Sequence, residues 1–328
     1  MSTVSTRGPR AVPPSRAGGP PPRRRTHQTP RRRTQEDSAR RLGNALVAPV
    51  LLVLLAITAY PLVNNLWNSF HQVILTKPGE TPWVGIDNYT RLLGDPDFTD
   101  SLTRTLVYTV ISVVLQIGLG VVVALVLHHE FRGRGFVRAA VLIPWAVPTV
   151  VSALLWRQMF DPRNGFVNYV LGALNLPGSD ITWLAGEWTA WVAIFVADSW
   201  KTVPFVAILV LAGLQVIPSE IYEAGTIDGA NRWQSFWRLT VPLLKPALLT
   251  ALVFRVLQSF LIFDVIFAMT VGGPGDTTET VTYLNWEAFL VRSDFGAGGA
   301  TSITIVVISL ALAGLATLAI RVRKEDTL

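Results

Sequence analysis

The sequence predicts an all-α polytopic membrane protein with six transmembrane helices. Half of its 328 residues are hydrophobic, and its mean hydropathy is +0.42. Only 15% of the residues are charged, compared with about 25% in a typical soluble domain. The charges are clustered, which leaves long apolar runs. Because a helix needs about 20 mostly apolar residues to cross a bilayer, each such run predicts one span. A β-barrel would instead show short alternating segments.

Polar stretches that contain charged residues, glycine and proline separate the apolar runs. The predicted spans are residues 42–70, 106–127, 139–160, 188–216, 243–271 and 297–320. Pro144 and Pro148 fall within the third span. Proline bends a helix and frees backbone carbonyls, which membrane helices tolerate where a cavity or a neighbour satisfies them. We therefore expect a bend in this span.

The distribution of Lys and Arg predicts that both termini are cytoplasmic. Cytoplasmic loops carry the excess of these residues. Twenty of the 28 Lys and Arg lie in the N-terminal tail, after the second span, after the fourth span or at the C-terminus. Six lie on the opposite side and two fall inside spans. Three loops are therefore expected to face outward.

Residues 1–41 form a separate tail in the sequence, ahead of a transmembrane domain at 42–328. The tail is rich in Pro, Gly and Ser and holds eleven Arg against Glu36 and Asp37. Such a segment cannot bury a core, so it is predicted to be disordered, cytoplasmic and in contact with lipid. A specific partner or a targeting role is the alternative. Since the basic charge belongs to the tail, no nucleic-acid binding by the remaining chain is expected.

The sequence predicts no catalytic, cofactor or metal site in this chain. It has no cysteine, which excludes thiolate metal sites and cysteine nucleophiles. The adjacent His128 and His129 would point apart on a helix, so they do not predict a metal site. No GxxxxGK[ST] sequence occurs. Because a P-loop is needed to hold nucleotide phosphates, any ATP chemistry is expected in a separate chain.

A polar stretch, EAGTIDGANRWQSFWRLTVPLLKP (223–246), separates the fourth and fifth spans. Ser219 is predicted to cap a first helix, and Asp228-Gly229 to form a turn. Trp233, Phe236 and Trp237 then form an apolar stripe on a second helix at the membrane surface. The pattern predicts a helix–turn–helix in loop 217–245, with an exposed turn suited to a soluble partner. An ordinary connector is the alternative.

This stretch resembles the EAA motif of binding-protein-dependent ABC importer permeases. The matching positions are Glu223-Ala224-Gly225, Asp228-Gly229-Ala230, Phe236, Leu239 and Val241-Pro242. Gly225 and Val241 depart from the usual residues, both by small or apolar changes. The resemblance covers nearly the whole chain after the tail. It is strongest to the carbohydrate, maltose-transporter-like type, through LIPWAVPTVVSALLWRQMF (142–160), DSWKTVPF (198–205) and FDVIFAMTVGGPGDTTETVTYLNWEAF (263–289).

The resemblance implies a type I ABC importer permease, with its core at about residues 101–321, in a bacterial cytoplasmic membrane. It implies import of an oligo- or disaccharide by alternating access. The implied partners are a second homologous permease, two ATPase subunits that bind ATP and Mg²⁺, and an extracytoplasmic solute-binding protein. A glycerol-phosphate-like solute is the alternative substrate. A secondary transporter would need its own ion site and usually internal repeats, and a membrane enzyme would need a catalytic constellation; the sequence shows none of these.

In this family the EAA turn inserts into a cleft of an ATPase subunit. The residues that the resemblance assigns to this contact are Glu223, Ala224, Gly225, Asp228, Gly229, Ala230, Trp233 and Phe236. We expect the two carboxylates to supply polar contacts or caps, and Gly229 to permit the turn. The alanines would allow close packing, and the two aromatic residues would anchor the second helix to the membrane domain.

Ionisable residues within the spans predict the substrate path, because such residues usually face a cavity or a partner. The candidates, with nearby aromatic residues, are Asp198, Trp200, Lys201, Phe205, Phe260, Asp264 and Phe267. Asp198 and Lys201 are three residues apart and share a helix face. They are expected either to hydrogen-bond sugar hydroxyls or to form a self-neutralising ion pair.

Arg255 and Asp264 are nine residues apart. On one continuous helix they would point to opposite sides, so they are not expected to face the same lumen. Asp264 would share its face with Phe260 and Phe267, which favours this face for a sugar. Arg255 would then pair with a partner subunit or another span. A purely structural role for both charges is the alternative.

Overall fold

The computed structural model describes the backbone of residues 30–77, 79 and 81–319, and the side chains of residues 47–77, 79 and 81–318. The chain forms two units, Met1–Tyr60 and Pro61–Leu328. Helix α1 (Pro30–Ser69) begins within the segment that the sequence assigns to the tail. Residues 30–41 are therefore helical, and they include Glu, Gln, Ala and Arg, which are good helix formers. Residues 1–29 lie outside the described part of the chain.

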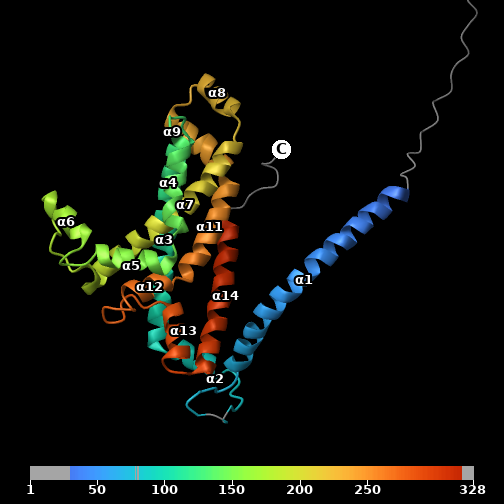
Figure 1. Cartoon of the computed structure of the whole chain (residues 1–328), viewed down its shortest axis with the longest axis vertical. Helices are drawn as coiled ribbons and strands as arrows, with labels where there is room; N and C mark the ends of the chain where they lie inside the picture. Colours follow the sequence, from blue (N-terminus) through green and yellow to red (C-terminus); the bar gives the residue numbers. More distant parts are fainter. Residues whose placement is uncertain (1–29, 78, 80, 320–328) are drawn as a thin grey trace, which may run out of the picture. The chain divides into compact units, whose positions relative to one another are not determined.

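Six segments account for the predicted membrane spans (Figure 1). Four helices are long and apolar enough to cross a bilayer: Val47–Ser69 within α1, α3 (Pro96–His128), α7 (Glu187–Val216) and α14 (Phe295–Ala319). The other two are bent. They comprise α4 (Arg134–Ala146) with α5 (Thr149–Met159), and Arg232–Leu243 with α11 (Lys245–Phe260). The all-α prediction is confirmed, and the described residues account for the six predicted spans when each bent pair is taken as one span.

The third span is broken where the sequence places its two prolines. Helices α4 and α5 meet at 94°. Helix α4 ends just after Pro144, and Pro148 is the N-cap of α5. Between them Val147 is extended, with φ −71° and ψ 133°. Since residues before proline avoid the helical region, the break follows from the sequence.

The fifth span differs from its predicted range of 243–271. Helix α11 ends at Phe260, and a separate helix α12 (Asp264–Met269) follows. At the junction Phe263 has φ −137° and ψ −57°, which is not helical. The prediction of one continuous helix here is therefore wrong, because apolar composition alone does not reveal a break that lacks proline or glycine.

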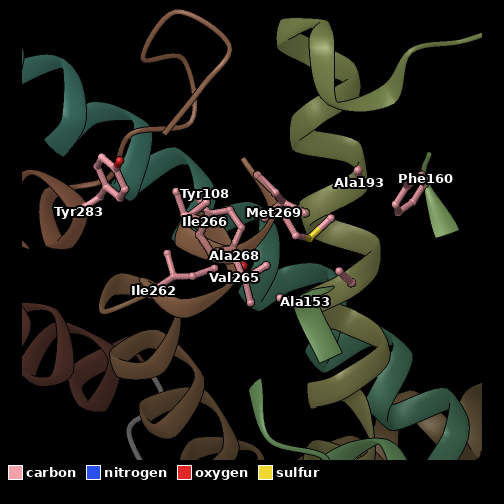
Figure 2. Packing of buried hydrophobic residues seen from close by; sticks show 12 residues of the cluster. Tyr108, Ala153, Phe160, Ala193, Ile262, Val265, Ile266, Ala268, Met269 and Tyr283 are labelled. Atoms are coloured by element: carbon pink, nitrogen blue, oxygen red, sulfur yellow. The ribbon is translucent and has the colours of Figure 1, made fainter. Parts of the chain in front are cut away.

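Helices α3, α7 and α11 pack against one another, and α14 packs on α11 and α13 (Val281–Leu290). Helix α8 (Ser219–Ile227) lies at one end of this bundle, and α2 (Asp87–Gly94) and α13 lie at the opposite end (Figure 1). Figure 2 shows one buried cluster, to which α3 contributes Tyr108, α7 contributes Ala193 and α5 contributes Ala153. Small residues such as Ala153 and Ala193 let membrane helices approach closely.

Candidate functional site

Loop 217–245 folds as the predicted helix–turn–helix. Helix α8 ends at Ile227, and Gly229 has φ +80°, a backbone conformation that favours glycine. The Ala230 N–H donates to the Gly225 carbonyl at 2.9 Å and closes the turn. The second arm contains α9 (Arg232–Ser235), a π-helix, η2 (Phe236–Thr240), and α10 (Val241–Leu243). It leads directly into α11.

The cap of the first arm differs from the prediction, and the second arm has a cap that was not predicted. Pro218, rather than Ser219, is the N-cap of α8, and no side chain caps this helix. Asn231 caps the second arm with a capping box: its side chain accepts from the Gln234 N–H at 2.9 Å, and the Gln234 side chain accepts from the Asn231 N–H at 2.9 Å. The Asn-x-x-Gln spacing is the sequence signal for this cap.

The surface of the turn is open to a partner. Glu223, Ala224, Asp228 and Gly229 are exposed, and neither carboxylate bonds to another described residue. Ala230 is half-buried. Ile227 beside the turn is 87% exposed, although sequence reasoning did not select it. An exposed isoleucine next to a charged turn is the signal that could have identified it.

Aromatic side chains of the second arm pack on one another. Trp233 is 70% exposed and Trp237 is 52% exposed, while Phe236 is half-buried. The ring centroids of Phe236 and Trp237 are 5.1 Å apart, and those of Trp233 and Trp237 are 5.7 Å apart. This cluster leaves most of the Trp233 surface available for lipid or a partner chain.

A cavity of about 400 Å³ lies between α7, α11 and the junctions that follow α4 and α11. Three of the predicted path residues line it, namely Asp198, Lys201 and Asp264. The remaining lining combines aromatic, hydroxyl, amide and apolar groups: Trp145, Thr149, Thr202, Arg255, Leu257, Gln258, Leu261, Ile262, Phe263 and Val265. Alternating polar and aromatic groups suit a polyhydroxylated solute.

The four predicted aromatic residues do not line this cavity. Trp200 lies in an apolar groove formed by α3, α4 and α7. Phe205 stacks on Trp145, which does line the cavity, at 5.9 Å between centroids. Phe260 is fully buried in a cluster that also contains Phe98. Phe267 stacks on Phe263, which also lines the cavity, at 5.4 Å between centroids. Phe205 and Phe267 therefore contact residues of the cavity wall without lining the cavity themselves.

Asp198 is the centre of a buried polar network. Its Oδ2 accepts from the Tyr108 hydroxyl at 2.8 Å and from the Gln116 amide at 2.7 Å, both on α3. The same oxygen lies 3.4 Å from Nη2 of Arg255 on α11. Arg255 is 2% exposed, and it also donates to Ser259. The network therefore joins the three central helices.

Lys201 does not pair with Asp198. Its Nζ donates to the Val147 carbonyl at 2.7 Å and to the Trp145 carbonyl at 3.4 Å. These carbonyls lie at the α4–α5 break. Of the two alternatives for Asp198 and Lys201, the ion pair between them is therefore wrong, because Arg255 pairs with the carboxylate instead.

Arg255 and Asp264 both line the cavity. The prediction that they face opposite sides is wrong, since the end of α11 at Phe260 interrupts the helical rotation between them. Arg255 pairs with another span of this chain, which was one of its two predicted partners.

Several residues of this region were missed because the predicted path contained only ionisable and aromatic residues. Gln258 and Thr149 line the cavity, and Tyr108 and Gln116 bind Asp198. A glutamine within the apolar run of α3 is a detectable signal, because an amide inside a membrane needs a partner.

Residues 116–324 match the family described as the inner membrane component of binding-protein-dependent transport systems. The chain belongs to this family. The permease is similar to the trehalose/maltose transport system permease protein MalF of Thermococcus litoralis, with 40% identity over 270 residues, 82% of this chain and 90% of that protein. The predicted membership in the ABC importer permeases is confirmed. The permease is therefore a multi-pass inner-membrane transport subunit and not an enzyme.

Other relatives carry related names. The trehalose transport system permease protein SugA of Mycobacterium tuberculosis is 36% identical over 266 residues, covering 81% of this chain and 84% of its own length. The sulfoquinovosyl glycerol transport system permease protein SmoG of Agrobacterium fabrum is 34% identical over 271 residues, covering 83% and 87%. A chain of a bacterial alginate ABC transporter, crystallised with an alginate pentasaccharide-bound periplasmic protein, has a TM-score of 0.74 at 21% identity, covering 88% of this chain and 96% of its own. This likeness confirms the fold.

Glu279, in the loop before α13, makes the stability of the permease depend on pH. It is 7% exposed, and burial together with the neighbouring Glu287 and Asp276 raises its pKa from 4.5 to about 7. The folded protein therefore holds a proton that the unfolded chain releases above pH 4.5, so the stability is expected to fall as the pH rises from about 4.5 through 7 and then to level off. We expect the melting temperature of purified permease to fall between pH 5 and pH 8, and to vary less in Glu279→Gln. Equal pH profiles for the two proteins would contradict this assignment.

Proposed function

We propose that the permease imports a sugar, a disaccharide or short oligosaccharide, using ATP hydrolysed by separate subunits. In this proposal it forms the channel with a second, homologous permease. Two ATPase subunits, which bind ATP and Mg²⁺, dock on loop 217–245, and an extracytoplasmic solute-binding protein delivers the sugar. The positive-inside distribution of charge supports a cytoplasmic position for loop 217–245 and both termini. No bound cofactor of its own is needed.

One observation carries this proposal: the exposed turn connects to the polar cavity through the second arm and α11, which follow each other directly in the chain and meet at a 69° bend. The second arm of loop 217–245 runs into α11, and α11 contributes Arg255 and Gln258 to the cavity. A partner that moves the turn therefore acts on the cavity wall. The relatives named for trehalose, maltose and sulfoquinovosyl glycerol support a sugar as the transported solute.

The side chains that line the cavity have distinct roles towards the sugar in this proposal. The Asp264 carboxylate accepts hydrogen bonds from sugar hydroxyls, and Gln258 and Thr149 add amide and hydroxyl groups. Lys201 keeps donor capacity beyond its two bonds to backbone carbonyls. Trp145 supplies an apolar ring face, which matches the C–H face of a pyranose. Asp198 lines the cavity but supports its wall rather than binding the sugar, because three donors already surround its Oδ2.

The test is uptake by the reconstituted complex in proteoliposomes. We expect labelled trehalose or maltose to enter only with ATP inside, the ATPase subunits present and a loaded binding protein outside. We expect Asp264→Asn and Gln258→Leu to lower uptake at least roughly tenfold, since a site that hydrogen-bonds substrate loses strongly when a partner is removed. Phe260→Leu is the control, because Phe260 lies outside the cavity. Uptake without the ATPase, or undiminished uptake by both cavity variants, would refute the proposal.

A further inference from the structure

Two contacts join the arms of loop 217–245 behind the exposed turn. The Tyr222 hydroxyl on α8 lies 3.2 Å from Oγ1 of Thr240 on the π-helix. One turn further along α8, Gly225 is buried, and a Cβ at this position would lie 2.8 Å from Cδ1 of Leu239. Tyr222 and Gly225 are three residues apart, so both face the second arm.

The bond between Tyr222 and Thr240 needs the hydroxyl groups of both residues. Thr240 is 4% exposed, and its hydroxyl also lies 3.4 Å from the Ser235 carbonyl, to which it can donate. A threonine hydroxyl has one proton and two acceptor sites. Either hydroxyl can therefore donate in the contact with Tyr222, and removal of either hydroxyl eliminates the bond.

The position of Thr240 connects this bond to the membrane helices. Thr240 is the last residue of the π-helix. Its carbonyl accepts from the Leu244 N–H at 2.9 Å, so backbone hydrogen bonding continues from Thr240 towards α11. Helix α11 begins at Lys245 and carries Arg255, which pairs with Asp198 on α7. A continuous chain of bonded groups thus leads from α8 through Thr240 into the central helices.

We propose that Tyr222 and Thr240 are positioning residues for energy coupling: their hydrogen bond holds the two arms together, so that displacement of the turn moves α11. This inference rests on the proposed function. Without the bond, α8 can pivot about the glycine turn while α11 stays in place. The close approach of Gly225 and Leu239 lets the two arms pack together. It does not fix their relative position, because it is an apolar contact with a flexible side chain.

The experiment compares uptake per ATP hydrolysed in the complete complex, reconstituted with its partner permease, ATPases and binding protein. We expect Tyr222→Phe and Thr240→Val each to lower this ratio about threefold or more, which is the effect of losing one hydrogen bond. The double variant should be no worse than the more impaired single variant, because both changes remove the same bond. Thr240→Ser, which keeps the hydroxyl, should restore the ratio.

Thr103→Val is the matched control. Thr103 lies on α3, outside loop 217–245, and is exposed. Among the described residues its hydroxyl donates only to the Thr99 carbonyl, one turn away on the same helix. We expect its ratio of uptake to ATP hydrolysis to equal that of the wild type. A variant that merely misfolds lowers the amount of complex, but it leaves the ratio per assembled complex unchanged.

Two outcomes would overturn the inference: an unchanged ratio in Tyr222→Phe, or additive losses in the double variant. Either result, obtained with a wild-type complex whose uptake requires ATP, refutes the role of the Tyr222–Thr240 bond and leaves the proposed function standing. ATP-independent uptake by the wild type would refute the proposed function itself.

Discussion

Replacing Asp198 by alanine should strongly destabilise the permease. The substitution leaves Arg255 buried without its carboxylate, and removal of one partner from a buried pair costs about 3–5 kcal/mol. It also leaves the Tyr108 hydroxyl and the Gln116 amide without their acceptor. For a chain of this size we expect the melting temperature to fall by about 10 °C, measured by thermal unfolding of the purified protein.

A paired substitution separates charge from packing in this network. In Asp198→Asn with Arg255→Gln, both charges are removed while polar side chains that can hydrogen-bond remain. We expect this double variant to melt close to the wild type, and Asp198→Asn alone to fall between the two. If the melting temperature of Asp198→Ala lies within about 2 °C of the wild-type value, the network does not stabilise the fold. Ordinary surface substitutions change the stability by a similarly small amount.

Replacing Gly229 by leucine should abolish transport without preventing membrane insertion. Gly229 has φ +80°, and a non-glycine residue in that region costs about 1–3 kcal/mol. No heavy atom lies within 4 Å of a Cβ placed there, so the strain falls on the backbone of the turn rather than on the core. We expect sugar uptake to fall at least roughly tenfold, because the altered turn no longer fits its ATPase cleft.

Gly133 offers a closely matched control for this experiment. It has φ +86°, and a Cβ at this position also meets no atom within 4 Å. Gly133→Leu therefore imposes the same kind of backbone strain at a turn outside loop 217–245. We expect this variant to transport normally at equal membrane abundance. Normal uptake by Gly229→Leu, or equal loss in both variants, would argue against a specific role for the 229 turn.

Much of the fold could be predicted from the sequence because bilayer thickness and charge distribution constrain it directly. The six spans, the bend at Pro144 and Pro148, and the turn at Gly229 follow from local rules. The break after Phe260 could not be predicted, since residues 261–263 are apolar and contain no helix breaker. Its effect was large, because one interrupted helix brings Arg255 and Asp264 to the same cavity.

The charged residues of the candidate site could be predicted from the sequence, but the contacts between them could not. Periodicity placed Asp198 and Lys201 on one face of α7, and both line the cavity. Which charge pairs with which depends on the packing of α3, α7 and α11, and helix spacing within one segment does not contain that information. The aromatic residues show the same limit, because residues of the right type at the right depth can stack on a cavity residue or face a lipid groove.

The position of Lys201 restricts how the substrate range of this permease can be engineered. One ammonium group both faces the cavity and binds the carbonyls of Trp145 and Val147 at the α4–α5 break. Changing residue 201 to admit a new sugar would therefore also alter the angle of the neighbouring span. Gln258 and Thr149 line the same cavity without bonding to that break, but the Gln258 Oε1 accepts from the buried Arg255 at 2.8 Å. Libraries aimed at new substrates should therefore vary Thr149 first and hold Lys201 constant.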